Sequence, residues 1–113
     1  MQIGKVYRNN KFVGLIKRDK DNKYYFKYDK NYLNSDNTKS ISINLKLREE
    51  EYVSDYLFSF FSNMLCEGDM KDLQCKQLRL DKDDDFSRLL KTAKENTIGS
   101  ITIKEVIKGA DNA

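Results

Sequence analysis

The sequence predicts an α+β domain in which an antiparallel sheet of about five strands is covered on one side by about three helices. Alternating apolar and polar residues, separated by turn-forming residues, occupy most of the first 47 positions. The apolar spacing becomes helical after this point, and an alternating segment returns at residues 100–104. Strands followed by helices and one final strand are typical of the α+β class.

The N-terminal residues predict a β-hairpin and a third strand. Residues 5–8 and 12–16 favour strands and flank Asn9 and Asn10, and Asn tolerates the positive φ that a two-residue hairpin turn requires. A third strand is expected at residues 24–28, where aromatic side chains at every second position place one face of rings toward the core.

A fourth strand is predicted at residues 41–47. Four apolar residues from Ile41 to Leu47 alternate there with polar ones, after a polar loop at residues 31–39. The segment at residues 100–104 is expected to return to the sheet as the last strand.

The next part of the chain predicts a first helix at about residues 53–65. Acidic residues at 49–51 favour a helix start, because they complement the helix dipole. Apolar residues follow at helical spacing, and we expect this stripe to be core. Its members are Val53, Leu57, Phe60, Phe61, Met64 and Leu65.

Two further helices are expected. Gly68 would end the first helix and Asp69 would cap the second. The second helix carries Met70, Leu73, Gln77 and Leu78. The third begins in the three Asp residues at 83–85 and ends near residues 96–99. Its apolar face consists of Phe86, Leu89, Leu90 and Ala93.

The composition indicates one folded domain. Of 113 residues, 39% are hydrophobic and 35% are charged, which places the chain among globular proteins with a single core. We expect the domain to span residues 1–107 and a polar tail at residues 108–113 to fray. No apolar run approaches the roughly 18 to 20 residues that cross a bilayer, and no secretion signal is visible. We therefore expect a cytoplasmic protein with no membrane partner.

The residue types that bind metals are scarce. With no His and two Cys, the chain has too few ligands for a tetrahedral zinc site, and Cys66 and Cys75 are expected to be reduced packing residues. The acids from Asp81 to Asp85 have calcium-loop spacing, but Phe86 stands where such a loop needs Gly. Helix capping explains these acids without a metal.

The chain lacks the residue patterns of common catalytic sites. Its five glycines lie too far apart to form a phosphate-binding loop, and no His can activate a Ser or Cys nucleophile. Its many carboxylates are typical of a solvated surface. We therefore expect a binding protein and not an enzyme, with no cofactor and no direct small-molecule substrate; an ATP-binding assay tests the enzyme class.

Nucleic-acid binding is the alternative function. The strand Tyr24–Tyr28 combines rings with a lysine, as in base-stacking sheets. Three of its rings share one face, however, which is also the pattern of a core strand and is the interpretation we favour. The net charge of +3, from 21 basic and 18 acidic residues interleaved along the chain, mainly serves solubility.

Five segments in order resemble the N-terminal subdomain of HipA-type toxin kinases, from about residue 5 to residue 104. They are residues 6–15, 26–28, 40–45, 60–68 and 85–90 with 98–101. The most specific is FFSNMLCEG at residues 60–68, which is similar to the family's Phe-Phe-x-Asn-Leu-Leu-Pro-Glu-Gly. The sequence departs from the family at Cys66 and Lys46, where Pro is usual, and at Asn10, where the turn usually has Gly.

The resemblance implies a protein partner. A HipA-type kinase continues beyond this subdomain into a larger body that holds the ATP site and the catalytic Asp. Free-standing copies are similar to the small antitoxin component (HipS-like) of split three-part toxin–antitoxin systems. By that resemblance the chain binds a separate HipA-like serine/threonine kinase and restrains it, with a helix-turn-helix DNA-binding chain as a further member of the complex. A domain cut from a longer chain is the other interpretation.

The turn at residues 65–70 is the candidate partner-binding site, with Glu67, Gly68, Asp69 and Met70 as its residues. Turns on a rigid scaffold concentrate binding residues, and the resemblance implies that this Glu-Gly turn faces the kinase. Capping by Gly68 and Asp69 would explain both residues without a partner. Met70 either tucks into the domain or anchors in a pocket of the kinase.

Overall fold

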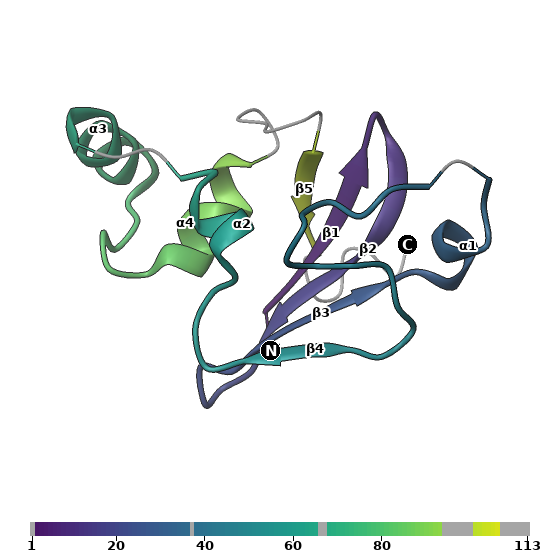
Figure 1. The fold of residues 1–113 in the computed structure, drawn as a ribbon. Coiled ribbons are helices and arrows are strands. Elements are labelled where there is room, and N and C mark those ends of the chain that lie inside the picture. Colours follow the sequence, from purple (N-terminus) through teal and green to yellow (C-terminus); the bar gives the residue numbers. More distant parts are fainter. Residues whose placement is uncertain (1, 37, 66–67, 94–100, 107–113) are drawn as a thin grey trace.

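The computed structural model describes residues 2–36, 38–65, 68–93 and 101–106, and the predicted α+β architecture is confirmed (Figure 1). The strands in this part of the chain form one antiparallel sheet in the order β4-β3-β2-β1-β5. They are β1 (Gln2–Arg8), β2 (Lys11–Arg18), β3 (Tyr24–Tyr28), β4 (Tyr52–Ser54) and β5 (Ile101–Glu105). The helices are α1 (Lys30–Leu33), α2 (Ser59–Ser62), α3 (Gly68–Leu78) and α4 (Asp85–Thr92).

The predicted hairpin joins β1 to β2. Asn9 and Asn10 have φ values of 49° and 68°, so both adopt the left-handed conformation of a tight hairpin turn. The pairing shifts register after Val6, and Gly14 lies opposite Val6 beside this bulge. A Cβ at Gly14 would lie 2.2 Å from the carbonyl oxygen of Lys27 on β3, so the close approach of these strands requires glycine here.

The helices that pack on the sheet cover the same face, which we call the covered face. These helices are α1, α2 and α4, and each contacts the covered face through one aromatic ring. Tyr32 of α1 stacks on Tyr28, Phe61 of α2 packs against Phe26, and Phe86 of α4 packs against Tyr24. The opposite face, called the open face, receives no ring contact, ion pair or side-chain hydrogen bond from a described helix. The buried core therefore lies in one layer between the sheet and its cover.

The predicted strand at residues 41–47 is wrong, because this segment is a loop with a tight turn. The amide of Leu45 donates to the carbonyl of Ser42 across 3.0 Å, in a single isolated bridge. Ile41 and Leu45 are buried, whereas Ile43 at the tip is 84% exposed. The Tyr28 hydroxyl donates to the Leu45 carbonyl and accepts from the Ile41 amide, so both ends of the turn are held over β3.

The predicted helix at residues 53–65 is also wrong in its extent. Tyr52–Ser54 instead pairs with β3 as an edge strand, where Val53 is 55% exposed, and only Ser59–Ser62 is helical. Within the predicted stripe, Phe61 and Met64 are buried, and Leu57 and Phe60 are partly buried against the core. A short helix is enough to cover this part of the core, because residues in the loops on either side of it also pack there.

The later elements follow the sequence more closely. The apolar face of α4 is buried as predicted, and the Asp84 carboxylate caps the helix by accepting from the Ser87 amide across 3.2 Å. The helix ends at Thr92, earlier than expected, while residues 94–100 lie outside the described part of the chain. The final strand forms at Ile101–Glu105 and pairs with β1. The tail predicted to fray, residues 108–113, also lies outside it.

Substitution of two neighbouring rings of α2 tests which of them belongs to the core. Phe61 is fully buried, so Phe61→Ala should lower the free energy of unfolding by about 3 to 5 kcal/mol. Phe60 is only partly buried, and Phe60→Ala should cost about 1 to 2 kcal/mol, because less apolar surface returns to water. Urea titration of both variants measures the difference; equal losses at the two positions would contradict this packing.

Candidate partner-binding surface

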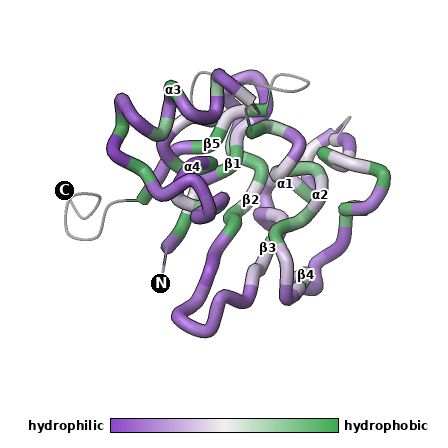
Figure 2. Tube along the Cα trace, turned by 90° about the vertical axis from the view of Figure 1, so that its left-hand side faces the viewer, coloured by the Kyte–Doolittle hydropathy of each residue, from purple (hydrophilic) through white to green (hydrophobic). Residues whose placement is uncertain are grey.

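Helix α3 stands apart from the rest of the domain. In Figure 1 it lies beyond α2 and α4, on the side away from the sheet, and Figure 2 shows hydrophilic and hydrophobic positions alternating along it. Cys75 is the buried residue of α3, with 4% of its surface exposed. An ion pair of 2.8 Å joins Asp72 of α3 to Lys82, but both side chains are more than half exposed. Burial therefore holds α3 to the domain only weakly.

The C-terminal end of α3 is defined by a backbone motif. The amide of Leu80 donates to the carbonyl of Cys75 across 2.8 Å, and Arg79 between them has a φ of 56°. This is the pattern of a Schellman motif, in which the residue after the helix adopts the left-handed conformation. The motif turns the chain sharply from α3 toward the start of α4.

Three apolar side chains of α3 face solvent, and we call them the α3 row. Met70 is 54% exposed, Leu73 48% and Leu78 47%. Met70 and Leu73 are three positions apart and lie on the same side of the helix. Exposed apolar side chains on a weakly held helix are available to anchor a partner protein, and Met70 and Leu73 are the two that share one side of α3.

The predicted site residues lie at the start of this helix. Gly68, Asp69 and Met70 form the first turn of α3 and are exposed, whereas Glu67 lies outside the described residues. Gly68 has a φ of 61°, but it does not end the preceding helix, because α2 already stops at Ser62. Met70 does not tuck into the domain. Its side chain is exposed, which leaves it available to a partner.

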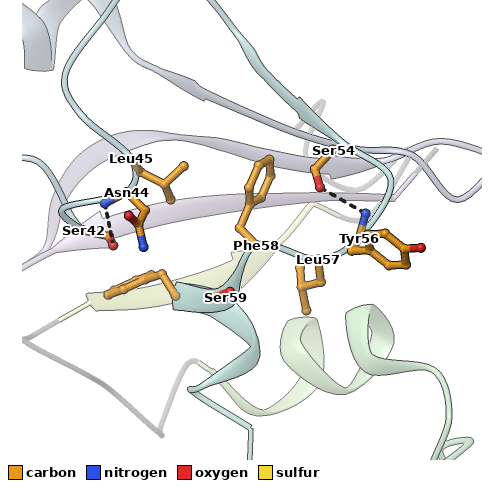
Figure 3. Close-up of a pocket in the computed structure, with 9 residues that line it drawn as sticks. Ser42, Asn44, Leu45, Ser54, Tyr56, Leu57, Phe58 and Ser59 are labelled. Carbon is orange, nitrogen blue, oxygen red and sulfur yellow. Dashed lines mark hydrogen bonds between the residues drawn. The ribbon is translucent and has the colours of Figure 1, made fainter.

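A hollow in the surface lies beside β4, apart from the α3 surface (Figure 3). It has a volume of about 350 Å³ and lies between the turn at residues 42–45 and the segment at residues 54–60. The Phe58 ring stands inside it between Leu45 and Leu57, while Tyr56 is turned outward and is 80% exposed. The sequence did not predict this hollow, because the strand expected at residues 41–47 and the helix expected at residues 53–65 would have placed its residues in regular elements.

The hydroxyl of Tyr28 holds the turn that borders this hollow. Tyr28 is buried, and burial raises its pKa to about 12, although the hydrogen bond from the Ile41 amide opposes the rise. The phenol therefore stays protonated over the physiological range and remains a donor to the Leu45 carbonyl. A ring in β3 thus fixes the turn at residues 42–45.

Comparison with known proteins identifies the domain type. The family model described as "HipA N-terminal domain" matches residues 4–104. The chain belongs to the HipA N-terminal domain family. A solved structure described as "N-terminal domain of HipA toxin" is 27% identical, with a TM-score of 0.71, and the match covers 96% of this chain and 95% of that one. An uncharacterized protein of Haemophilus influenzae is 29% identical over 105 residues, which are 93% of each sequence.

The family segment at residues 60–68 has a clear structural role in this HipA N-terminal domain. Phe61 packs against Phe26, with ring centroids 5.6 Å apart, and Met64 and Leu65 are also buried. These residues fix α2 on the sheet, and the chain then leads to the exposed start of α3. The same short segment therefore joins a core anchor to the candidate site.

The described part of this HipA N-terminal domain contains no candidate metal-binding cluster and no helix that could span a membrane. Its Cys, Asp and Glu residues form no group of three or more that could hold a metal ion. None of the described helices combines the length and the hydropathy that crossing a bilayer requires.

The start of α4 is fixed by a charged cluster on the covered face. Arg18 of β2 donates to the Asp84 carboxylate across 2.8 Å, stacks on the Phe86 ring at 5.4 Å, and donates to the side chain of Gln2. The Ser87 hydroxyl also donates to Asp84, across 2.8 Å. Burial opposes ionisation of Asp84, but the hydrogen bonds from Arg18 and Ser87 outweigh it and hold the pKa of Asp84 below its ordinary value.

The lowered pKa of Asp84 predicts a pH-dependent contribution to stability. A carboxyl group whose pKa is lower in the folded state stabilises the fold above its unfolded pKa, and this stabilisation disappears as the pH falls through the folded pKa. Asp84→Asn keeps a capping oxygen but removes the charge, and should cost about 1 to 2 kcal/mol at neutral pH. Urea titrations of both proteins should converge toward pH 3, below the ordinary Asp pKa of about 3.9.

Asp83→Asn is the matched control, because Asp83 is exposed and neighbours the cap. It should change the free energy of unfolding by less than about 0.5 kcal/mol at either pH. A cost of Asp84→Asn that is the same at neutral and acidic pH would show that the Arg18 pair does not stabilise α4 through charge.

Proposed function

We propose that the chain is a non-catalytic subunit that binds a separate HipA-like serine/threonine kinase and restrains it, as an antitoxin or accessory subunit of a toxin–antitoxin system. The observation that carries this proposal is the family match over residues 4–104, which is to the N-terminal domain and not to a kinase catalytic domain. We further expect the complex to form in the cytoplasm and to accept a helix-turn-helix DNA-binding chain.

The proposed contact with the kinase comprises Glu67 together with Gly68, Asp69 and Met70 of the first turn of α3, and continues along the α3 row. Met70 and Leu73 offer apolar side chains that lose exposed surface on binding. Methionine is a flexible side chain that adapts to a partner pocket. The proposed surface has an apolar centre with charged residues around it, as protein interfaces commonly do.

The charges beside the α3 row suggest the complementary chemistry on the kinase. Asp69 lies in the first turn of α3 and is exposed. Asp72 is exposed and forms an ion pair with Lys82. We expect an apolar pocket on the kinase for Met70 and at least one basic group near Asp69, because opposite charges at an interface rim favour encounter and orientation.

The alternative of nucleic-acid binding through Tyr24–Tyr28 receives less support. Phe26 and Tyr28 are 0% and 1% exposed, and Tyr24 packs against Phe86 on the covered face. Bases stack only on rings that solvent can reach. These three rings belong to the core, which leaves the kinase-binding proposal as the one that the observations favour.

Complex formation tests the proposal in its simplest form. The chain, co-expressed with a HipA-like kinase from the same genome, should elute with it as one species in gel filtration at micromolar concentration and in moderate salt, because an apolar interface resists screening. Two independent peaks under these conditions would overturn it.

Met70→Asp tests the proposed contact residue. The variant should weaken kinase binding more than about tenfold, or about 1.4 kcal/mol, because it places a charge in an apolar interface. The melting temperature of the isolated domain should change by no more than a few degrees, since Met70 is already half exposed. Asn31→Asp, which adds the same charge to an exposed position of α1, is the control and should bind normally. Unchanged affinity of a folded Met70→Asp protein would remove this turn from the interface.

A further inference from the structure

The open face of the sheet carries a row of lysines that cross-strand pairing places side by side. Lys104 of β5 lies opposite Lys5 of β1, Lys5 lies opposite Leu15 of β2, and Leu15 lies opposite Lys27 of β3. The row therefore crosses four strands and contains three lysines and one leucine. We call it the lysine row.

The lysine row is costly for the isolated domain. Like charges directly opposite each other on neighbouring strands destabilise a sheet, and Lys5 faces Lys104 in this way. Among the described residues, no carboxylate forms an ion pair with Lys5, Lys27 or Lys104. Lys104 contacts the Tyr7 ring, whose centroid lies 5.1 Å from its Nζ.

Three of the nearby carboxylates are already engaged, whereas Glu49 and Glu50 line a shared hollow with Lys27 and Lys30. Glu51 pairs with Lys17 at 3.3 Å, and Asp19 accepts from the Tyr25 hydroxyl across 2.7 Å. Asp29 accepts from the amide of Asn31 and caps α1. Lys5 and Lys104 therefore carry the least compensated charge of the open face, and the ligand complementary to them is anionic.

An apolar hollow adjoins the lysine row. It has a volume of about 300 Å³. Phe12 and Leu15 provide apolar lining, Lys17, Lys27 and Lys30 provide positive charge beside it, and Asp29 adds one carboxylate. A ligand that satisfies both features has a large apolar group flanked by carboxylates.

We propose that the open face is a second docking surface, which binds an extended acidic protein segment whose apolar side chain enters the hollow beside Phe12 and Leu15. The carboxylates on either side of that anchor pair with Lys5, Lys27 and Lys104. This surface lies on the sheet and is distinct from the start of α3. It gives the domain a separate site for an acidic tail or linker of a partner protein.

The rings of the open face favour a protein segment over single-stranded nucleic acid. Tyr7 and Phe12 lean against each other, with centroids 5.7 Å apart and planes at 58°, and Lys104 lies over Tyr7. The Tyr25 hydroxyl is bound to Asp19. All three rings are half-buried, so they offer edges and partial surfaces instead of the free ring faces on which bases stack.

Fluorescence anisotropy with a labelled synthetic peptide tests this proposal on the full chain. The probe is a short peptide with one central Phe flanked on both sides by Glu and Asp. It should bind saturably, and replacing its Phe with Gly should weaken binding about tenfold, because the apolar anchor is lost. Replacing its acids with Gln and Asn should weaken it by at least as much.

Two charge reversals identify the surface. Lys27→Glu and Lys104→Glu should each weaken peptide binding about tenfold, since each replaces an attraction with a repulsion. Lys104→Glu should at the same time leave the melting temperature of the free domain unchanged or raise it by a few degrees, because Glu opposite Lys5 is a favourable cross-strand pair. Lys76→Glu on α3 is the control and should bind the peptide normally.

Three outcomes would overturn the proposal. The first is the absence of saturable peptide binding, and the second is equal binding by the control and both charge-reversal variants. The third is that oligothymidylate of similar length displaces the peptide and binds more tightly than it does, which would make the open face a nucleic-acid surface. Because these measurements involve no kinase, they are independent of the function proposed for α3.

Discussion

The structure depends on one constraint, which is that every covering element packs on the same face of the sheet. Side chains of a strand alternate between faces, so the register of β1, β2 and β3 fixes which residues are core and which face outward. Gly14 makes this register sterically feasible, because a Cβ there would collide with the backbone of β3. The aromatic contacts of α1, α2 and α4 and the turn at residues 42–45 all follow from this face being apolar. The open face and α3 are what remains available for partners.

The domain is held firmly near the sheet and loosely at α3. Buried rings, the Tyr28 hydroxyl and the Arg18–Asp84 pair connect loops and helices directly to strands. Helix α3 has one buried residue, an exposed ion pair and a backbone motif at its end. Elements with few buried contacts open most easily, and binding surfaces are often drawn from them. A partner that covers the α3 row would therefore order this helix as well as bind it.

Sequence patterns predicted the elements wherever the pattern had one physical explanation. The paired Asn residues of the hairpin require a tight turn, and the apolar face of α4 is a clear helical stripe after a capping Asp. The strand prediction for residues 41–47 failed because a turn can bury its first and last apolar residues while the middle one, Ile43, faces solvent. The prediction of one helix at residues 53–65 failed because Val53 pairs with β3 at the edge of the sheet and Phe61 reaches the core from a short helix. The exposure of the α3 row could not be predicted, since a helical stripe does not reveal which surface it meets.

Hydrogen–deuterium exchange on the complex with a HipA-like kinase tests the central claim most directly. The claim is that the rigid sheet presents a loosely held α3 to the kinase. Amides of residues 68–73 should exchange rapidly in the free domain and become strongly protected in the complex, while those of the β1–β2 hairpin change little. Protection confined to the hairpin or to the turn at residues 42–45, with α3 unaffected, would contradict this account.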